Sequence, residues 1–188
     1  MRFIFFIFAA LFLSITASAQ TAEQAKPSPT PTPVAIKPAT AADVSSPDAI
    51  LKALYDVISG DAGKPRDWDR FRSLFYKGAH LIPTGKNRQG THVARMMTPD
   101  EYISGNSSFF EKEGFHERES ARKSDRYGNI MQVFSTYEAY KTATDKEPFM
   151  RGINSIQLFN DGSRWWIMNV YWQAETPENP LPKEYLKN

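Results

Sequence analysis

The chain has 188 residues, of which 41% are hydrophobic and 23% charged, a composition that leaves room for one globular domain with extensions. The absence of cysteine excludes a disulfide framework, a thiolate metal site and a cysteine nucleophile. A net charge of +2 is too small for the electrostatic footprint of a nucleic-acid binder, so no nucleic-acid partner is expected.

The first 19 residues have the pattern of a secretory signal peptide. Arg2 precedes an apolar run over residues 3–13, and Ala17 and Ala19 form an A-x-A cleavage motif before Gln20. The alternative is a membrane anchor, but eleven apolar residues make a helix of only about 16 Å, roughly half a bilayer core. We therefore expect cleavage after Ala19 and a soluble mature protein, periplasmic or secreted, with no membrane partner.

Residues 20–46 are rich in Pro, Ala, Thr and Ser and contain almost no large apolar side chain. Such a segment cannot bury enough surface to offset the entropy lost on ordering, so it is predicted to be a disordered spacer. The alternative, a Pro-rich recognition motif, would require a specificity that a spacer does not need. The folded domain is expected over residues 47–188.

Three helices are predicted in the first half of this domain from their end signals and from apolar residues at helical spacing. Their start and stop residues are Ser46 and Gly60, Asp67 and Gly78, and Thr98 and Gly114. Thr98 forms a capping box with Glu101. The apolar faces comprise Ile50, Leu51, Leu54, Tyr55 and Ile58; Trp68, Phe71, Leu74 and Phe75; and Tyr102, Ile103, Phe109 and Phe110.

The second half of the domain is predicted to be strands, because the helical period disappears after Phe115. Residues 80–83 form a short apolar strand, residues 115–125 and 130–141 form one hairpin, and residues 149–159 and 164–173 form another. Asp161-Gly162 between the last two strands is a strong hairpin signal. Helices followed by an antiparallel meander indicate the α+β class.

The last strand is apolar on both of its faces under simple alternation. One face holds Trp166, Met168, Val170 and Trp172, and the other holds Trp165, Ile167, Asn169 and Tyr171. Helices can cover only one face, so the other needs a partner. We expect a homodimer packed sheet to sheet.

Three strand segments carry a resemblance to a known family. Val133–Glu138, Arg151–Leu158 and Asp161–Ile167, in this order after the helices, resemble the NTF2-like superfamily in its bacterial SnoaL-like branch over roughly residues 47–173. The resemblance implies a cone in which a curved antiparallel sheet wraps around the helices, with a pocket inside and frequent dimerisation through the sheet. Its members include isomerases, dehydratases, cyclases and non-catalytic binding modules, so the fold does not fix the function.

Two amides are the best candidates for polar groups inside an apolar pocket. Asn106 shares the helix face of Tyr102, and Asn154 lies between Gly152 and Ile156 on one strand face. Either amide contacts a ligand or satisfies a buried backbone group. The predicted ligand-binding residues are Asn106, Asn154, Arg151, Tyr102 and Trp172.

Glu138 is the candidate catalytic base, since a carboxylate held among aromatic strand residues can have a raised pKa. His80 or Tyr140 would serve as the acid or orienting group. In the alternative interpretation, Glu138 faces solvent and forms an ion pair with a positively charged residue such as Arg151. His80 would then be a half-buried, hydrogen-bonded residue of the core.

No metal site or cofactor is expected, because no two histidines stand at ligand spacing and no dinucleotide or phosphate-binding motif is present. The charged residues of one strand alternate in sign and indicate a solvated sheet face with cross-strand ion pairs. They are Glu117, Arg118, Glu119, Arg122 and Lys123.

The leading hypothesis is a secreted, dimeric domain whose pocket binds a small, largely apolar molecule without a determined reaction. One alternative is a lyase or isomerase that uses Glu138 as general base. The other is a non-catalytic dimeric interaction module. A deep pocket that contains Glu138 would favour the enzyme. A deep pocket without a pair of titratable residues would favour the ligand-binding protein, and a cone filled by side chains would favour the interaction module.

Overall fold

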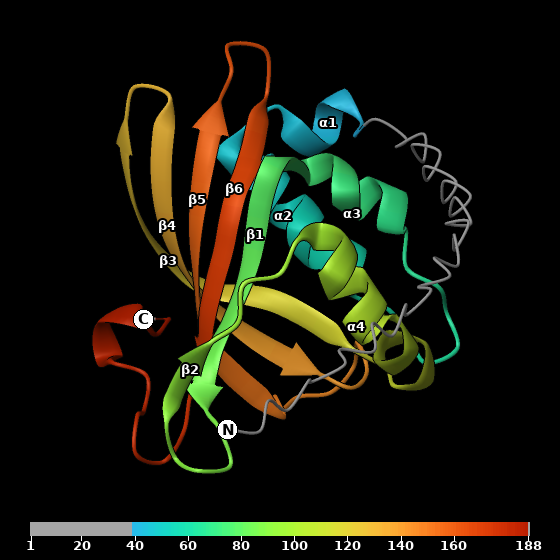
Figure 1. Ribbon diagram of the computed structural model, residues 1–188, viewed down its shortest axis with the longest axis vertical. Coiled ribbons are helices and arrows are strands. Elements are labelled where there is room, and N and C mark those ends of the chain that lie inside the picture. Colours follow the sequence, from blue (N-terminus) through green and yellow to red (C-terminus); the bar gives the residue numbers. More distant parts are fainter. Residues whose placement is uncertain (1–38, 188) are drawn as a thin grey trace, which may run out of the picture. The chain divides into compact units, whose positions relative to one another are not determined.

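The computed structural model describes residues 39–187 (Figure 1). The predicted signal peptide and residues 20–38 of the predicted spacer lie outside this range. The helices are α1 (Ala41–Val44), α2 (Pro47–Ile58), α3 (Trp68–Leu74), α4 (Pro99–Lys112) and a short 3-10 helix, η1 (Lys183–Tyr185). The strands are β1 (Phe75–Lys86), β2 (His92–Ala94), β3 (His116–Tyr127), β4 (Ile130–Tyr140), β5 (Met150–Asn160) and β6 (Trp165–Ala174).

The strands form one sheet in the order β2-β1-β6-β5-β4-β3. Only the β1–β6 pair is parallel among the pairs in the described residues. The sheet curves around α2, α3 and α4, which cover its concave face (Figure 1). The predicted α+β class and the predicted architecture, with helices packed in a curved sheet, are confirmed.

The helices begin where the capping signals predict. Ser46 Oγ accepts a hydrogen bond from the Ala49 amide, Asp67 from the Arg70 amide, and Thr98 and Glu101 form the reciprocal capping box. Helix α3, the second of the three predicted helices, ends earlier than predicted, at Leu74, because Phe75 pairs with β6 and starts β1. That strand is accordingly much longer than the predicted 80–83 segment.

Both predicted hairpins are confirmed, with β3 paired to β4 and β5 paired to β6. The simple alternation along β6 is wrong, because the register shifts opposite Gln157 and Leu158 and leaves Met168 as an extra residue. The bulge places Trp165 and Ile167 on the same, concave side as Val170 and Trp172. Trp165, Ile167 and Val170 are buried there.

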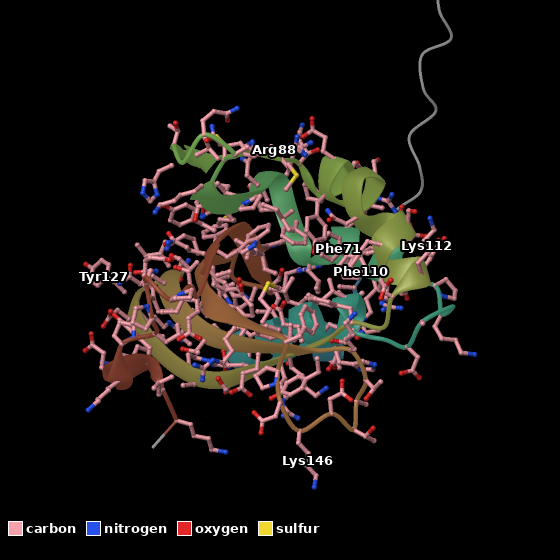
Figure 2. All side chains as sticks on the ribbon, turned by 90° about the horizontal axis from the view of Figure 1, so that it is seen from below. Phe71, Arg88, Phe110, Lys112, Tyr127 and Lys146 are labelled. Atoms are coloured by element: carbon pink, nitrogen blue, oxygen red, sulfur yellow. The ribbon has the colours of Figure 1, made fainter. Side chains whose placement is uncertain are left out.

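The core lies between the helices and the concave side of the sheet. Phe71 of α3 and Phe110 of α4 point into it, whereas Lys112 and Lys146 point outward (Figure 2). Phe109, predicted to be on the buried face of α4, is 46% exposed because it lies at the solvent edge of that face.

The last residues of the predicted spacer, which ends at residue 46, are ordered in the structure. Residues 41–44 form α1, Val44 is buried, and the Asp43 carboxylate pairs with the Arg70 guanidinium at 2.7 Å. A short helix with one apolar anchor and one ion pair packs here despite the low apolar content of the segment. The domain therefore includes residues 39–46.

The convex side of the sheet, here called the outer face, is partly covered by the tail, residues 175–187 (Figure 1). Phe134 of the outer face packs against Tyr185, with ring centroids 5.6 Å apart. Thr136 Oγ1 donates to the Tyr185 carbonyl at 2.6 Å, and Lys123 pairs with Glu184 at 3.0 Å. The face through which a homodimer was expected is thus partly occupied by the chain's own tail.

Candidate functional site

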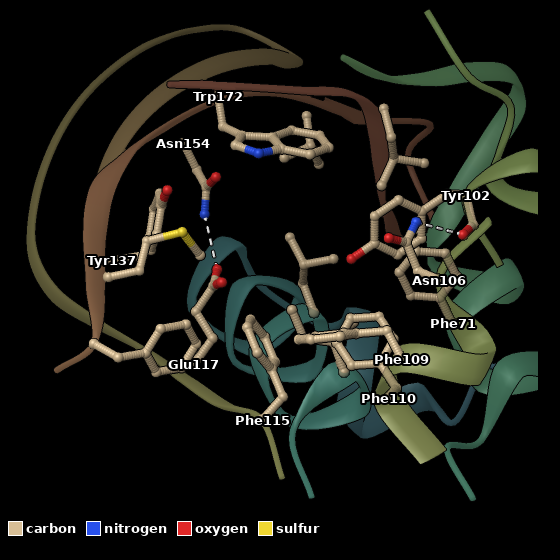
Figure 3. A pocket seen from close by; sticks show the side chains of 16 residues that line it. Phe71, Tyr102, Asn106, Phe109, Phe110, Phe115, Glu117, Tyr137, Asn154 and Trp172 are labelled. Atoms are coloured by element: carbon tan, nitrogen blue, oxygen red, sulfur yellow. Dashed lines mark hydrogen bonds between the residues drawn. The ribbon is translucent and has the colours of Figure 1, made fainter. Parts of the chain in front are cut away.

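A cavity of about 340 Å³ lies between the concave side of the sheet and helices α2, α3 and α4. Its volume is within the range of small-molecule sites, which are mostly apolar concave pockets with a few polar groups. The lining residues are Leu54, Ile58, Phe71, Leu81, Tyr102, Asn106, Phe109, Phe110, Phe115, Glu117, Tyr137, Phe149, Met150, Asn154, Val170 and Trp172 (Figure 3).

Aromatic contacts fix the helix-side wall of the cavity. The Tyr102 ring stacks on Phe71 at 5.5 Å and meets Trp172 edge-on at 6.3 Å. Phe110 packs edge-on against Phe115 at 5.1 Å. Such offset and edge-to-face pairs stabilise a defined ring geometry beyond the area that they bury. The wall is therefore preorganised and helix α4 is held at a fixed distance from the sheet.

A polar cluster lies at the opposite, sheet-side end of the cavity. Asn154 of β5 donates through Nδ2 to Glu117 Oε1 at 3.2 Å (Figure 3). The same Nδ2 donates to the Tyr55 hydroxyl at 3.1 Å. The Tyr55 hydroxyl also hydrogen-bonds Ser135 Oγ at 2.6 Å, and Ser135 donates to Glu119. Asn154 thus holds the Glu117 carboxylate from one side and leaves its other side facing the cavity.

Burial raises the pKa of Glu117 to about 7, and the hydrogen bond from Asn154 opposes this shift only in part. No Lys, Arg or His in the range 39–187 forms an ion pair with this carboxylate. Burial also raises the pKa of Tyr55, Tyr102 and Tyr137, so these phenols stay neutral. Glu117 is the cavity group that can change charge near neutral pH.

Tyr137 lies against Gly152 of the neighbouring strand at the sheet-side wall. Its hydroxyl is buried and has no hydrogen-bond partner among the described residues. A Cβ on Gly152 would come within 2.5 Å of that hydroxyl, so only glycine leaves room for the ring. The wall therefore carries a donor that the protein itself leaves unsatisfied, which is costly unless another group reaches it.

Four of the five predicted ligand-binding residues line the cavity: Tyr102, Asn106, Asn154 and Trp172. The Asn106 amide donates to the Tyr102 carbonyl at 2.7 Å, which is the backbone-satisfying alternative. Asn154 instead bonds two side chains. Arg151 does not line the cavity and pairs with Glu175 at 2.8 Å on the outer face.

The three predicted catalytic residues do not come together in the cavity. Glu138 points to the outer face, where it accepts a hydrogen bond from the Tyr140 hydroxyl at 2.6 Å and lies 3.9 Å from Arg118. His80 pairs with Asn169 in the β1–β6 register and also lies on the outer side. The register turns the face that carries Phe134, Thr136 and Glu138 away from the cavity, so Glu138 does not meet the condition set for a buried base.

Glu117 was interpreted as part of a solvated charged face, and this interpretation is wrong for that residue. Glu117 pairs with Ala139 in the β3–β4 register and shares the concave side with Phe115. The sequence held a signal: Phe115 opens the strand, and alternation places residue 117 on the same side as a buried aromatic. Arg118, one residue on, does form the expected cross-strand ion pair with Glu138.

No cluster of three or more His, Asp or Glu side chains suited to a metal ion occurs within residues 39–187. In the same range no helix is long and apolar enough to cross a membrane. The chemistry of the cavity is therefore that of one carboxyl, two amides, two phenols and an indole set in an apolar wall.

No protein-family model matches the chain, and no curated protein matches it significantly. Among solved structures, the chain is similar to a cystatin-like-fold protein of unknown function from Nostoc punctiforme (10% identity, TM-score 0.50, covering 70% of this chain and 89% of that one). It is also similar to a structure described as a calcium/calmodulin-dependent protein kinase II association domain from Xanthomonas campestris (13% identity, TM-score 0.50, coverage 69% and 86%).

A third similar structure is an NTF2-like protein of unknown function from Silicibacter pomeroyi (13% identity, TM-score 0.45, coverage 70% and 94%). The few helices packed against a curved, unclosed sheet are consistent with the NTF2-like cone, and at a TM-score of 0.50 the chain shares the fold of the first structure, which is described as cystatin-like. At these identities the likeness establishes the fold alone and does not distinguish the SnoaL-like branch, which stays a prediction.

Proposed function

We propose that the chain binds a small, mostly apolar ligand in the cavity and orients it through a polar group at Glu117 and Asn154. The observation that carries the proposal is the cavity itself: about 340 Å³ of space within an aromatic wall, with its polar side chains gathered at few points. A domain that only needed a stable core would fill this space, since unfilled apolar volume costs stability.

The proposal is tested by titrating the protein with N-phenyl-1-naphthylamine, an uncharged dye that fluoresces in apolar surroundings. We expect saturable binding of one dye per chain. Asn106→Trp places a large ring in the cavity and should weaken binding about tenfold or more. Ser104→Trp adds the same ring at an exposed site on the same helix and serves as the control. Equal affinities for both variants would contradict binding in this cavity.

A second candidate function is proton transfer, as in an isomerase or lyase, with Glu117 in the role expected for Glu138. It is favoured by a carboxyl whose pKa of about 7 suits a general base, facing the Tyr102 ring across the cavity (Figure 3). Native mass spectrometry of protein purified from the cells that produce it would identify a retained molecule. Incubation of that molecule with protein in D₂O should then exchange one carbon-bound hydrogen, and Glu117→Gln should abolish the exchange.

Export is proposed on the sequence alone. The n-region, apolar run and A-x-A motif within residues 1–19 support removal of this segment during secretion to the periplasm or beyond. Intact-mass measurement of the protein recovered from the host of origin should give a chain that starts at Gln20. A recovered chain that retained residues 1–19 would contradict the proposal.

A further inference from the structure

The charge balance of the cavity is one-sided. Its lining contains a single carboxyl group, that of Glu117, and no Lys, Arg or His. The buried Arg66 lies outside the lining, with its guanidinium 5.7 Å from the Phe110 ring centroid. It donates to the backbone carbonyls of Ile58, Gly60, Asp61 and Lys64, which uses four of its five N–H groups. The carboxylate is therefore left without a cation inside the cavity.

Aromatic faces surround the same space. Phe115 lies beside Glu117, with Tyr137 on the sheet side, Trp172 above and Tyr102 across the cavity (Figure 3). The faces of such rings carry negative charge density and attract an organic cation within about 6 Å, more strongly when the site is dry. This wall therefore suits a ligand that has an apolar body and a positive charge, and it does not suit an anion.

The hydrogen-bonding capacity that the cluster leaves open also suits a cation. Both hydrogen bonds of the Asn154 side chain with described residues use Nδ2, and the one to Glu117 reaches Oε1. Glu117 Oε2 and Asn154 Oδ1 take part in no hydrogen bond between described residues and remain as acceptors. An ammonium group has up to three donors and no acceptor. It can therefore serve both oxygens at once.

From this convergence we propose that the ligand is a hydrophobic organic amine, whose ammonium group pairs with Glu117 within the aromatic cavity. The inference rests on the proposed function and narrows its ligand to one chemical class. The main rival is a neutral ligand with a carbonyl, which would accept a hydrogen bond from a protonated Glu117. The two differ in how binding depends on pH.

The charged and titratable groups around Glu117 set this dependence. The cavity side presents the neutral phenols of Tyr102 and Tyr137, and the neutral phenol of Tyr55 lies beside the cluster through its hydrogen bond from Asn154. Glu117 also lines a surface depression between α2 and β3, which is bordered by charged residues of both signs: Asp48, Lys52 and Asp56 of α2, and Arg118, Glu119 and Arg122 of β3. Arg122 is paired with Asp48 and Glu119, and Lys52 with Asp56. None of these cations pairs with Glu117.

An amine whose own pKa is far above neutral stays charged while Glu117 titrates. Because the ammonium binds the carboxylate form, amine affinity should rise with pH and level off above about 7, the pKa of Glu117. Between about pH 5.5 and about pH 8.5 the expected gain is on the order of 10- to 30-fold. A neutral acceptor ligand should show the opposite slope, because it needs the protonated carboxyl.

The experiment compares 4-phenylbutylamine with 4-phenylbutan-1-ol by calorimetry at both pH values. We expect the amine to bind the wild-type chain at least about tenfold more tightly than the alcohol at the higher pH. Glu117→Gln keeps an oxygen for Asn154 and should remove that preference and the pH dependence of amine binding. Glu138→Gln makes the same change to a carboxylate on the outer face and should retain both the preference for the amine and the pH dependence of amine binding.

The outcomes separate this inference from the proposed function. If the alcohol binds as tightly as the amine at the higher pH, or the preference survives in Glu117→Gln, the ligand class is wrong and the binding cavity stands. If neither compound nor the uncharged dye binds, the proposed function is overturned, and the ligand class with it. An amine preference that Glu138→Gln abolishes would place the cation on the outer face and also overturn the inference.

Discussion

The two faces of the sheet carry similar carboxylates in opposite surroundings. Glu117 and Glu138 lie on adjacent strands, offset by one residue in the register, so the pleat points them to opposite sides. Glu138 has a tyrosine donor and Arg118 beside it, and its side chain is 25% exposed. Glu117 accepts a hydrogen bond from the Asn154 amide and forms no ion pair with any residue in the range 39–187. One residue of register thus decides whether a glutamate is an ordinary ion-pair partner or a group that titrates near neutral pH.

The largest expected contrast comes from the same substitution on each side of β6. Trp172→Asp puts a charge into the cavity wall and should lower the free energy of unfolding by about 3–5 kcal/mol. Tyr171→Asp, at a site 48% exposed on the outer face, should cost less than about 1 kcal/mol. Chemical denaturation measures both variants, and equal losses would contradict the assignment of faces.

The same pair tests the proposed homodimer, because only Tyr171 can reach a second copy. If the wild-type chain sediments as a dimer at micromolar concentration, Tyr171→Asp should sediment as a monomer. A monomeric wild-type chain would contradict the dimer and leave the tail as the cover of the outer face.

The next effect concerns pH. The pKa of Glu117 is raised in the folded state, from an ordinary 4.5 to about 7, so the stability associated with its protonated form is complete below about pH 4.5 and lost as pH rises through 7. The loss is at most about 3 kcal/mol. Glu117→Gln should therefore flatten the fall in unfolding free energy between about pH 5 and about pH 8, whereas Glu138→Gln should keep it. A matching slope in wild type and Glu117→Gln would show that other groups cause it.

A smaller effect is expected from the glycine beneath Tyr137. Gly152→Ala introduces a methyl group that meets both the Tyr137 hydroxyl and the Gln173 carbonyl, and it should destabilise the chain by about 1–3 kcal/mol. Gly85→Ala lies in the same sheet with open space around the added carbon and should be close to neutral. Thermal unfolding compares the two variants, and a neutral Gly152→Ala would mean that the wall is looser than described.

The smallest effect is on the outer face. Tyr185→Ala removes the ring that packs on Phe134 and should cost about 1 kcal/mol, since the contact is partly exposed. Tyr127→Ala removes an aromatic ring that is 85% exposed and provides the control. If both variants unfold at the same denaturant concentration, the tail does not contribute measurably to stability.

Elements set by short-range signals could be predicted from the sequence. The caps at Ser46, Asp67 and Thr98 and the Asp161-Gly162 turn depend on residues a few positions apart, and the structure has helix starts and a hairpin at these places. The early end of α3 could not be predicted in this way. Phe75 joins β1 because β6, some ninety residues later, supplies its hydrogen bonds.

The residues of the candidate site could be predicted from the sequence only in part. Strand alternation puts Glu138 on one face of its strand, but it cannot say which side of the sheet the helices cover. Tyr102, Asn106 and Asn154 were found because polar groups on apolar faces are unusual. Glu117 was missed because the run of charges around it suggested solvent. The cavity itself is a volume that packing leaves empty, and no residue pattern encodes it.

The extra residue at Met168 has a consequence for comparing this chain with distant relatives. It divides β6 into two short stretches whose inward positions are out of phase, Trp165 and Ile167 before it and Val170 and Trp172 after it. In a chain that lacks this extra residue, regular alternation would still point the equivalents of Ile167, Val170 and Trp172 inward, because the residue that is missing is the one without a partner on β5. An alignment with such a chain therefore needs a gap of a single residue at Met168, and without that gap it would match the cavity wall of one chain to the outer face of the other.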